Sequence, residues 1–210
     1  DLDTLTACAL VAFLRRKPLV YDSHELFTGL PELNKRPMTR KIWSFFEHVC
    51  IKKTVAQSTV CESIAKELEN KYGKPFVVVR NVPHYASGID ISSDSPRNEK
   101  ILIYQGSLNM GRGIEIMIKA MQYLDGFTLV IAGTGYLENT LRKLTAELNL
   151  NHKVTFTGLL SPSELKKLTS KAQLGLSLEE DICVNYKYAL PNKLFDYIQA
   201  RVPVLTSNLP

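Results

Sequence analysis

The sequence predicts an α/β protein whose parallel sheets carry helices on both faces. Short strands rich in branched apolar residues alternate with longer helical stretches along nearly all of the 210 residues. The alternation is interrupted between residues 83 and 100 by a polar stretch rich in turn residues. Because this interruption separates two α/β runs, we expect parts of two domains joined by a linker.

The first run is expected to contain three strands and three helices. The strands are predicted at 18–22, 55–60 and 76–79, and the helices at 5–14, 39–54 and 64–72. Gly73 is expected to end the third helix, since glycine readily adopts positive φ at a helix C-terminus. The second helix has an apolar stripe with helical spacing, formed by Ile42, Phe45, Phe46, Val49 and Cys50.

The second run is expected to form a doubly wound sheet, which binds ligands at the carboxyl ends of its strands. Its strands are predicted at 101–105, 127–132, 154–157, 174–178 and 202–206. Its helices are predicted at 113–124, 136–148 and 191–200, and a further helix, the third in chain order, is predicted to begin at residue 162. Ser161 and Glu164 are expected to cap the third helix, with Pro162 at its first position. The side chains expected to face the sheet from the first two helices are Ile114, Met117, Ile118, Met121, Leu137, Leu141, Leu144 and Leu148.

Composition excludes several classes of protein. Hydrophobic residues make up 45% of the chain, which is enough for a packed core. No apolar run approaches the roughly 20 residues of a transmembrane helix, and no signal-peptide pattern is found. The four cysteines, at positions 8, 50, 61 and 183, form no CxxC pair, so neither a zinc site nor a disulfide framework is expected. We therefore expect a cytoplasmic protein with reduced thiols.

The net charge of +5 is unevenly distributed. Residues 15–53 contain nine Lys or Arg and four Asp or Glu, together with Trp43, Phe45 and Phe46. No nucleic-acid motif accompanies this charge, so nucleic acid is not an expected partner. A basic surface with aromatic residues favours peripheral contact with an anionic membrane, on the inner face of the cell membrane. A solvated basic face over a packed helix explains the same composition.

The helix predicted at 191–200 has the features of a nucleotide site. Asn192 and Lys193 begin the helix, where free N–H groups favour an anion, and Asp196 follows about one turn later. A carboxylate at that place can accept hydrogen bonds from sugar hydroxyls, which in a nucleotide lie close to the phosphates. An ordinary capped helix in an α/β sheet explains the same spacing.

A series of short segments resembles a known family. In chain order they are VYDSHEL at 20–26, VRNVP at 79–83, YQGSLNMGRG at 104–113, VIAGTG at 130–135, VTFTG at 154–158, and LPNKLFDY with ARVPV at 190–204. Their order resembles the GT-B glycosyltransferases, in particular the retaining family 4. The resemblance implies two Rossmann-like parallel-sheet domains, both incomplete. Residues 1–82 are then the C-terminal part of an acceptor-side domain, 83–99 a linker, and 100–210 an incomplete nucleotide-sugar donor-binding domain, so we expect a fragment.

The resemblance also implies donor-site residues. Gly106 and Ser107 begin a loop that approaches the diphosphate, and Arg112 supplies a cation there, although Ser107 stands where the family commonly has Arg. Gly133 belongs to a G-x-G turn, which by itself is a weak signal because a tight turn also needs glycine. The segment 158–160 is expected to flank the nucleobase.

The last part of the chain and one histidine complete the expected site. Asp196 corresponds to the family's ribose-binding acid, and Tyr188 stands eight residues earlier, where the family often has an acid near the donor sugar. Asn192 and Lys193 are expected on the diphosphate. His24 is the catalytic candidate, because a histidine of this region lies over the donor sugar in the resembling enzymes. A histidine that caps a strand for structural reasons is the alternative.

The function implied by the resemblance is retaining transfer of a sugar from a UDP- or GDP-linked donor. The expected acceptor is a glycan or lipid-linked glycan in surface polysaccharide synthesis, and neither a cofactor nor a metal is expected. Two alternatives stay open. A sugar-nucleotide 2-epimerase of the same fold predicts UDP binding without an acceptor, and a non-catalytic basic binding module predicts salt-sensitive binding without nucleotide dependence.

Overall fold

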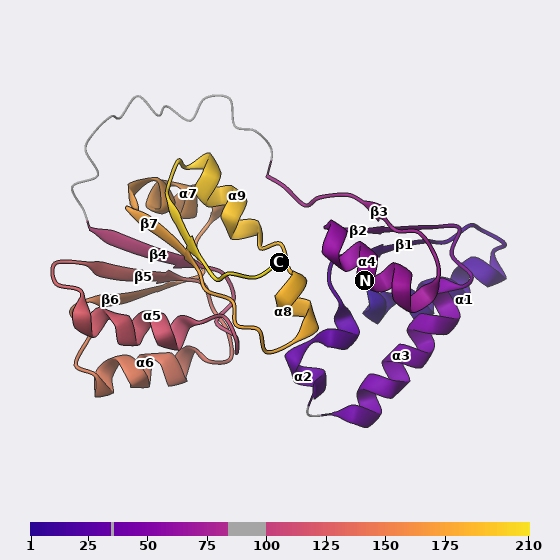
Figure 1. Ribbon diagram of the computed structural model, residues 1–210, viewed down its shortest axis with the longest axis horizontal. Coiled ribbons are helices and arrows are strands. Elements are labelled where there is room, and N and C mark those ends of the chain that lie inside the picture. The colour runs from indigo at the N-terminus through magenta and orange to yellow at the C-terminus, as the bar shows by residue number, and fades with distance from the viewer. Residues whose placement is uncertain (35, 84–99) are drawn as a thin grey trace. The chain divides into compact units, whose positions relative to one another are not determined.

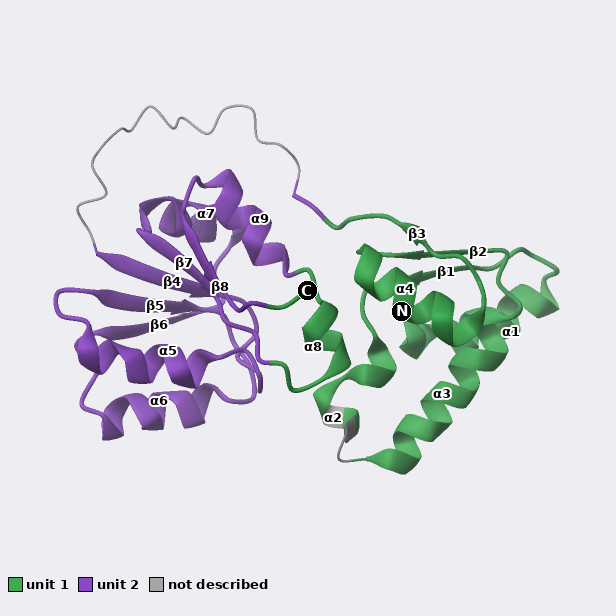
Figure 2. Cartoon of the chain, viewed as in Figure 1, with its two compact units in different colours: residues 1–81, 181–190, 209–210 green, residues 82–180, 191–208 purple. Residues whose placement is uncertain are grey.

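The computed structural model describes residues 1–34, 36–83 and 100–210 of the chain (Figure 1). The chain divides into two compact units (Figure 2). Unit 1 comprises residues 1–81, 181–190 and 209–210, and unit 2 comprises residues 82–180 and 191–208. The predicted linker lies, apart from Pro83, outside the described residues, so the predicted domain boundaries stay a prediction.

Residues 181–190 belong to unit 1, although the predicted division placed them in the second domain. They contain a short helix, α8 (Val184–Tyr188), that packs on unit 1. The Leu26 N–H donates to Asn185 Oδ1 at 2.9 Å, and the Cys61 thiol donates to the Tyr188 carbonyl at 3.3 Å. These bonds explain why residues 181–190, which lie within the second run in sequence, belong to unit 1.

Unit 1 is built on a parallel sheet of three strands, in the order β1 (Val20–Ser23), β2 (Ala56–Thr59) and β3 (Val77–Val78). Besides α8 it contains α1 (Leu2–Leu14), η1 (Phe27–Gly29), α2 (Pro31–Asn34), α3 (Pro37–Ile51) and α4 (Glu62–Tyr72). Helix α4 ends at Gly73, which has φ +67°, as predicted. The buried core consists of Leu2, Leu5, Tyr21, Leu26, Cys50, Ile51, Cys61, Ile64, Ala65, Leu68 and Phe76.

The apolar stripe of α3 is largely exposed. Ile42 and Phe45 are 54% and 64% exposed, and of the five residues in the stripe only Cys50 is buried. The side of α3 that enters the core also carries Glu47 and Ile51. A buried glutamate on that side is tolerated because it accepts hydrogen bonds from two side chains of α4. The periodicity therefore predicts the helix correctly, but it does not identify the side that is buried.

Unit 2 is built on a parallel sheet of five strands in the order β6-β5-β4-β7-β8. The strands are β4 (Ile101–Gln105), β5 (Thr128–Ala132), β6 (Val154–Gly158), β7 (Leu174–Ser177) and β8 (Val204–Thr206). The helical elements are α5 (Ile114–Ala120), η2 (Met121–Tyr123), α6 (Glu138–Glu147), α7 (Pro162–Lys171) and α9 (Asn192–Gln199). Helices α5 and α6 cover one face of the sheet, and α7 and α9 cover the other (Figure 1). The predicted doubly wound sheet is confirmed.

The core of unit 2 has a layer on each face of the sheet. On the α5 and α6 side, the buried cluster includes Leu102, Tyr104 and the inward residues predicted for the first helix, which lie in α5 and η2. On the other side, Ile103 packs with Tyr197 of α9. Neighbouring residues of β4 thus face opposite layers, as strand geometry requires. The capping box predicted for α7 is also present, since the Glu164 N–H donates to Ser161 Oγ at 3.3 Å and the Ser161 N–H donates to Glu164 Oε2 at 2.9 Å.

Membrane-spanning helices, disulfides and metal clusters are absent from the described residues. No helix there has the length and apolar character needed to cross a membrane. All four cysteines, which fall within the described ranges, carry free thiols. No three His, Cys, Asp or Glu side chains in the part of the chain that the structure describes lie close enough together to hold a metal ion.

Candidate functional site

The glycines after β4 and β5 allow two loops to pack against each other at the carboxyl edge of the unit 2 sheet. Gly133 has φ +145°, and a Cβ atom there would lie 1.9 Å from the Gly106 carbonyl oxygen. A Cβ atom on Gly135 would lie 2.5 Å from the Leu108 carbonyl oxygen. Between these contacts the Leu108 N–H donates to the Thr134 carbonyl at 2.9 Å. The G-x-G turn is therefore required by backbone packing, whether or not a ligand is bound.

The segment after β7 is fixed to the same loop. The Glu180 N–H donates to the Gly111 carbonyl at 2.9 Å, and a Cβ atom on Gly113 would lie 2.2 Å from the Leu178 carbonyl oxygen. The loop at 106–113 is thus held on one side by the loop after β5 and on the other by the segment after β7. Its backbone is rigidly placed before any ligand arrives.

Two adjoining cavities open at this edge. The first, of about 360 Å³, is lined by Gly106, Ser107, Ala132, Gly133, Thr134, Leu159, Leu160 and Leu165. The second, of about 710 Å³, shares Leu160 and Leu165 with the first and is also lined by Gln105 and Asp196. Both volumes lie in the range of small-molecule sites. The predicted residues Gly106, Ser107 and Gly133 therefore meet at one cavity, and Asp196 lines its neighbour.

Asp196 is held by a chain of side-chain hydrogen bonds. Gln105 Nε2 donates to Asp196 Oδ2 at 2.7 Å, and the Thr169 hydroxyl donates to Gln105 Oε1 at 2.9 Å. Burial raises the pKa of Asp196, and the hydrogen bond from Gln105 opposes this rise. Since a carboxylate can accept about four hydrogen bonds, one bond from Gln105 leaves capacity for ligand hydroxyls.

Arg112 and Lys193 both lie near Glu179, a residue that the sequence did not identify. Lys193 Nζ is 2.5 Å from Glu179 Oε1 and 4.5 Å from the centre of the Tyr104 ring, and Arg112 Nη1 is 3.6 Å from the same oxygen. Lys193 and Glu179 are only 8% and 5% exposed. The Lys193 ammonium, expected at the diphosphate, is thus engaged by a buried carboxylate. Asn192 is exposed at the first position of α9.

Burial acts on both partners of this ion pair. Burial alone would raise the pKa of Glu179, but the charge of Lys193 and hydrogen bonds from Lys193 and Ser177 outweigh it and lower the pKa. The pKa of Lys193 is lowered by burial, an effect that Glu179 opposes and the charge of Arg112 reinforces. The carboxylate is therefore ionised and shared between two cations.

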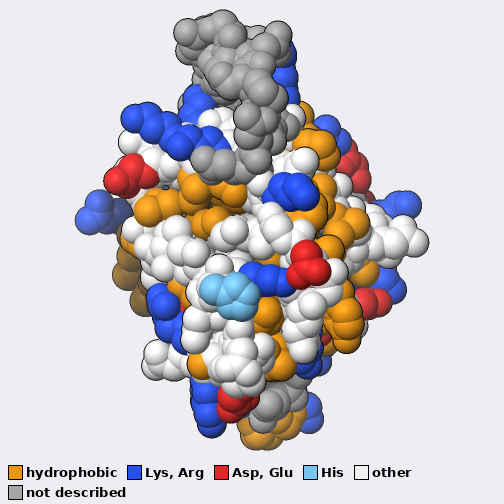
Figure 3. Space-filling model, turned by 90° about the vertical axis from the view of Figure 1, so that its left-hand side faces the viewer, with side chains coloured by type: hydrophobic (Ala, Val, Ile, Leu, Met, Phe, Trp, Pro, Cys, Tyr) orange, Lys and Arg blue, Asp and Glu red, His pale blue; other side chains and the backbone are white. Residues whose placement is uncertain are grey.

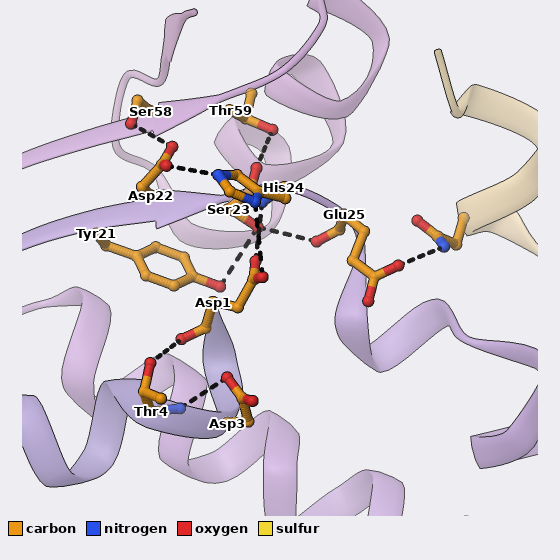
Figure 4. Close-up of polar contacts among 11 residues, drawn as sticks. Asp1, Asp3, Thr4, Tyr21, Asp22, Ser23, His24, Glu25, Ser58 and Thr59 are labelled. Atoms are coloured by element: carbon orange, nitrogen blue, oxygen red, sulfur yellow. Dashed lines mark hydrogen bonds and ion pairs between the residues drawn. The ribbon is translucent and has the colours of Figure 1, made fainter. Parts of the chain in front are cut away.

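His24 and Tyr188 belong to unit 1. The His24 side chain is 58% exposed at the end of β1, with Nε2 2.8 Å from Asp22 Oδ2 (Figure 4). Burial alone would raise the pKa of Asp22, but hydrogen bonds from Ser58 and His24 outweigh it and lower the pKa. Tyr188 packs against the unit 1 core. Their roles in donor binding stay predictions.

Three residues of the unit 2 site were missed by sequence reasoning, namely Gln105, Thr169 and Glu179. Gln105 is a polar residue at the end of a buried strand, and Glu179 follows another strand closely. Polar residues at the carboxyl ends of parallel strands are a signal for a site. Thr169 gives no such signal, because it is one of several hydroxyl residues on α7.

The fold is that of a GT-B protein, with a Rossmann-like unit that has two cavities at the carboxyl edge of its sheet. Residues 89–210 match the sequence profile of the family described as glycosyl transferases group 1. The chain belongs to this family.

One relative is similar to the chain in sequence, and two solved structures share its fold. An uncharacterized glycosyltransferase of Methanocaldococcus jannaschii is 36% identical over 133 residues, which cover 55% of this chain and 34% of the relative. Anabaena HepE in complex with UDP-glucose superimposes with a TM-score of 0.75 at 17% identity, over 100% of this chain and 58% of HepE. Sucrose-phosphate synthase from Thermosynechococcus elongatus gives 0.71 at 17% identity, over 96% of this chain and 54% of the synthase. The chain thus spans a third of the curated relative and little over half of these two structures.

Proposed function

We propose that the whole protein is a glycosyltransferase whose donor, a nucleoside diphosphate sugar, binds to unit 2. The observation that carries this proposal is the pair of adjoining cavities, one lined by the glycine loops and the other by Asp196. A nucleotide needs both features, since its phosphates require close approach to backbone N–H groups and its ribose requires a hydrogen-bond acceptor. Membership of the family supports the same conclusion.

The geometry suggests how unit 2 assists departure of the nucleoside diphosphate. As the bond to the sugar breaks, negative charge grows on the β-phosphate, and positive groups near it stabilise the transition state. We assign this role to Arg112, which belongs to the loop at 106–113, and to the N-terminus of α9. Retention of the anomeric configuration is proposed to follow from displacement on the same face of the sugar, without the paired carboxylates of retaining glycosidases.

Binding of nucleotides tests the proposal. The 210-residue chain is titrated with UDP, GDP, ADP and CMP by calorimetry, and UDP is the first choice because HepE was solved with UDP-glucose. Selective binding of one nucleoside diphosphate, competed by the corresponding nucleotide sugar, is expected. Failure of all four to bind to a chain that circular dichroism shows to be folded contradicts the proposal.

The acceptor is proposed to be a glycan or a lipid-linked glycan in surface polysaccharide synthesis. The family and the complex of Staphylococcus aureus TarM with fondaparinux, α-GlcNAc-glycerol and UDP support a carbohydrate acceptor. The 2-epimerase alternative is tested by incubating the chain with UDP-N-acetylglucosamine alone and recording proton NMR spectra. Appearance of the 2-epimer without an acceptor favours the epimerase over the transferase.

Peripheral contact with an anionic membrane is proposed for the surface formed by α1 and α3. Phe13, Met38 and Phe45 are 71%, 69% and 64% exposed there, and the Lys53 ammonium lies 5.6 Å from the centre of the Phe13 ring. Residues 15–53 supply further exposed cations. Apolar side chains flanked by basic ones suit a surface of anionic lipids. In contrast, on the face shown in Figure 3 basic side chains are scattered among acidic and hydrophobic ones.

Cosedimentation with vesicles tests this contact. We expect the chain to pellet with vesicles that contain phosphatidylglycerol and not with pure phosphatidylcholine. Replacing Phe13 and Phe45 together by Ser should reduce pelleting several-fold, whereas Tyr123→Ser, at an 85% exposed position of unit 2, should not. Pelleting that is insensitive to Phe13 and Phe45, or none at all, contradicts the membrane contact.

A further inference from the structure

Glu179 connects three segments that are far apart in sequence. It follows β7, its Oε2 accepts a hydrogen bond from Ser177 Oγ at 2.7 Å, and its Oε1 faces Lys193 of α9 and Arg112 of the loop at 106–113. The Glu180 N–H ties the same segment to Gly111. The carboxylate is thus rigidly mounted at the place where the two expected diphosphate elements meet.

Lys193 and Arg112 differ in how closely their charged groups approach Glu179. Lys193 is 8% exposed, bonds to Glu179 at 2.5 Å and lies over the Tyr104 ring, so its ammonium is directed into the protein. The Arg112 side chain is 23% exposed, and its Nη1 is 3.6 Å from Glu179 Oε1. Because the guanidinium is planar and its donors have fixed directions, the contact with Glu179 helps to set the direction in which Arg112 faces.

We propose that Glu179 is a positioning residue for donor binding, which orients the Arg112 guanidinium toward the diphosphate and holds Lys193 inward as its buried counter-ion. This inference rests on the proposed nucleotide site. It assigns Arg112 the direct phosphate contact and gives Lys193 a supporting role. An ionised Glu179, as its lowered pKa indicates, is required for both.

The direction in which one substitution changes the affinity for an anion distinguishes a positioning role of Glu179 from simple charge balance. Glu179→Gln removes a negative charge close to the bound phosphates. If Glu179 only offset the two cations, its removal would strengthen binding of an anion, because the local net charge becomes more positive. If Glu179 positions Arg112, its removal weakens binding even though the local charge becomes more favourable.

The experiment compares the affinities of the 210-residue chain for UDP and for uridine. If the calorimetric titration with the four nucleotides selects another base, GDP and guanosine or ADP and adenosine take their place. Glu179→Gln is expected to weaken UDP binding by about tenfold, as for loss of a hydrogen bond between charged groups, and to leave uridine binding unchanged. Glu147→Gln, which removes the same formal charge from an exposed pair on α6, should leave both affinities unchanged. The double variant Glu179→Gln with Lys193→Gln restores the local charge but should stay weak.

Three results would overturn the inference. The first is UDP binding that is unchanged or tighter in Glu179→Gln. The second is an equal loss of affinity for UDP and uridine, which indicates a structural role, and the third is recovery of UDP binding in the double variant. Each of these leaves the proposed function intact, since the wild-type chain still binds the nucleotide. Absence of nucleotide binding by the wild-type chain overturns the proposed function, and this inference with it.

Discussion

At the scale of single residues, Asp196 is the proposed ribose contact, and its partial burial has a cost in stability. Its carboxylate lines the larger cavity and accepts a hydrogen bond from Gln105. If it also accepts bonds from ribose hydroxyls, Asp196→Asn should weaken nucleotide binding by about tenfold. Calorimetric titration measures this, and Asp125→Asn, at a 99% exposed side chain of the same unit, is the control. Equal affinity in wild type and Asp196→Asn would exclude the ribose contact.

The same substitution should make the folded chain more stable at neutral pH. Burial raises the pKa of Asp196, so the folded chain binds the proton more tightly than the unfolded chain. The ordinary pKa of this group is 3.8, so above this pH the unfolded chain loses the proton before the folded chain does. The free energy of unfolding therefore falls as pH rises, until the carboxyl of the folded chain is ionised too. We expect Asp196→Asn to raise the free energy of unfolding at pH 7 slightly, since solvent screens this partly exposed carboxyl, and to lose this effect well below pH 3.8. Urea denaturation at both pH values checks the sign.

Sequence reasoning identified individual residues unevenly, and the reasons are physical. Gly106, Ser107 and Gly133 were predicted from the family resemblance, and they meet at one cavity because glycines directly after parallel strands allow close approach of a neighbouring backbone. Glu179 was missed because a carboxylate in the sequence gives no sign of which cations lie near it after folding. Lys193 was predicted at the diphosphate from its place in the helix, but the direction of its side chain depends on Glu179, fourteen residues earlier.

At the scale of secondary-structure elements, α3 and α4 are joined by a buried polar cluster. Glu47 of α3 is 2% exposed, and Lys71 Nζ and the Tyr72 hydroxyl of α4 both donate to its Oε2. The Tyr21 hydroxyl of β1 lies 3.5 Å from Oε1. Burial and the charge of Glu47 raise the pKa values of Tyr21 and Tyr72, which keeps both hydroxyls protonated as donors.

Glu47→Gln should therefore destabilise unit 1 substantially. A buried hydrogen bond to a charged group contributes about 1.5–3 kcal/mol, so we expect a loss of about 2 kcal/mol in the free energy of unfolding. Glu62→Gln is the matched control, because Glu62 forms an ion pair with Arg80 in which both side chains are more than half exposed, and no measurable change is expected. Denaturation followed by tyrosine and tryptophan fluorescence measures both variants. Similar stabilities for the two variants would show that the cluster does not hold α3 to α4.

Most elements could be predicted from local signals, and the exceptions depend on distant contacts. The start of α7 was predicted correctly because its capping box is formed by residues three apart. The short helix α8 is not among the predicted helices, since five residues carry too little periodicity to identify a helix. The apolar periodicity of α3 does not by itself show that its stripe is exposed, because the partners that hold Glu47 in the core lie on another element.

At the scale of the whole molecule, both units are discontinuous in sequence. Unit 1 receives residues 181–190, although unit 2 resumes at residue 191 with the helix that carries Asn192, Lys193 and Asp196. Both described ligand cavities are lined entirely by residues of unit 2. Such a division could not be predicted from a linear pattern, because the segment returns to unit 1 through hydrogen bonds made by Asn185 and Tyr188.

Hydrogen exchange with and without a saturating nucleoside diphosphate gives a whole-molecule test. A ligand that binds only the folded form of unit 2 stabilises that unit by mass action, about 2.7 kcal/mol at one hundred times Kd. We therefore expect slower exchange in the loops at 106–113 and 133–135 and in α9, by up to about 100-fold for amides that exchange through global unfolding of unit 2. Amides of β1 and β2 in the core of unit 1 should keep their rates. Equal protection of both units would mean that the chain unfolds as one cooperative body, whereas protection confined to unit 1 would place the nucleotide away from Asp196 and contradict the proposed site.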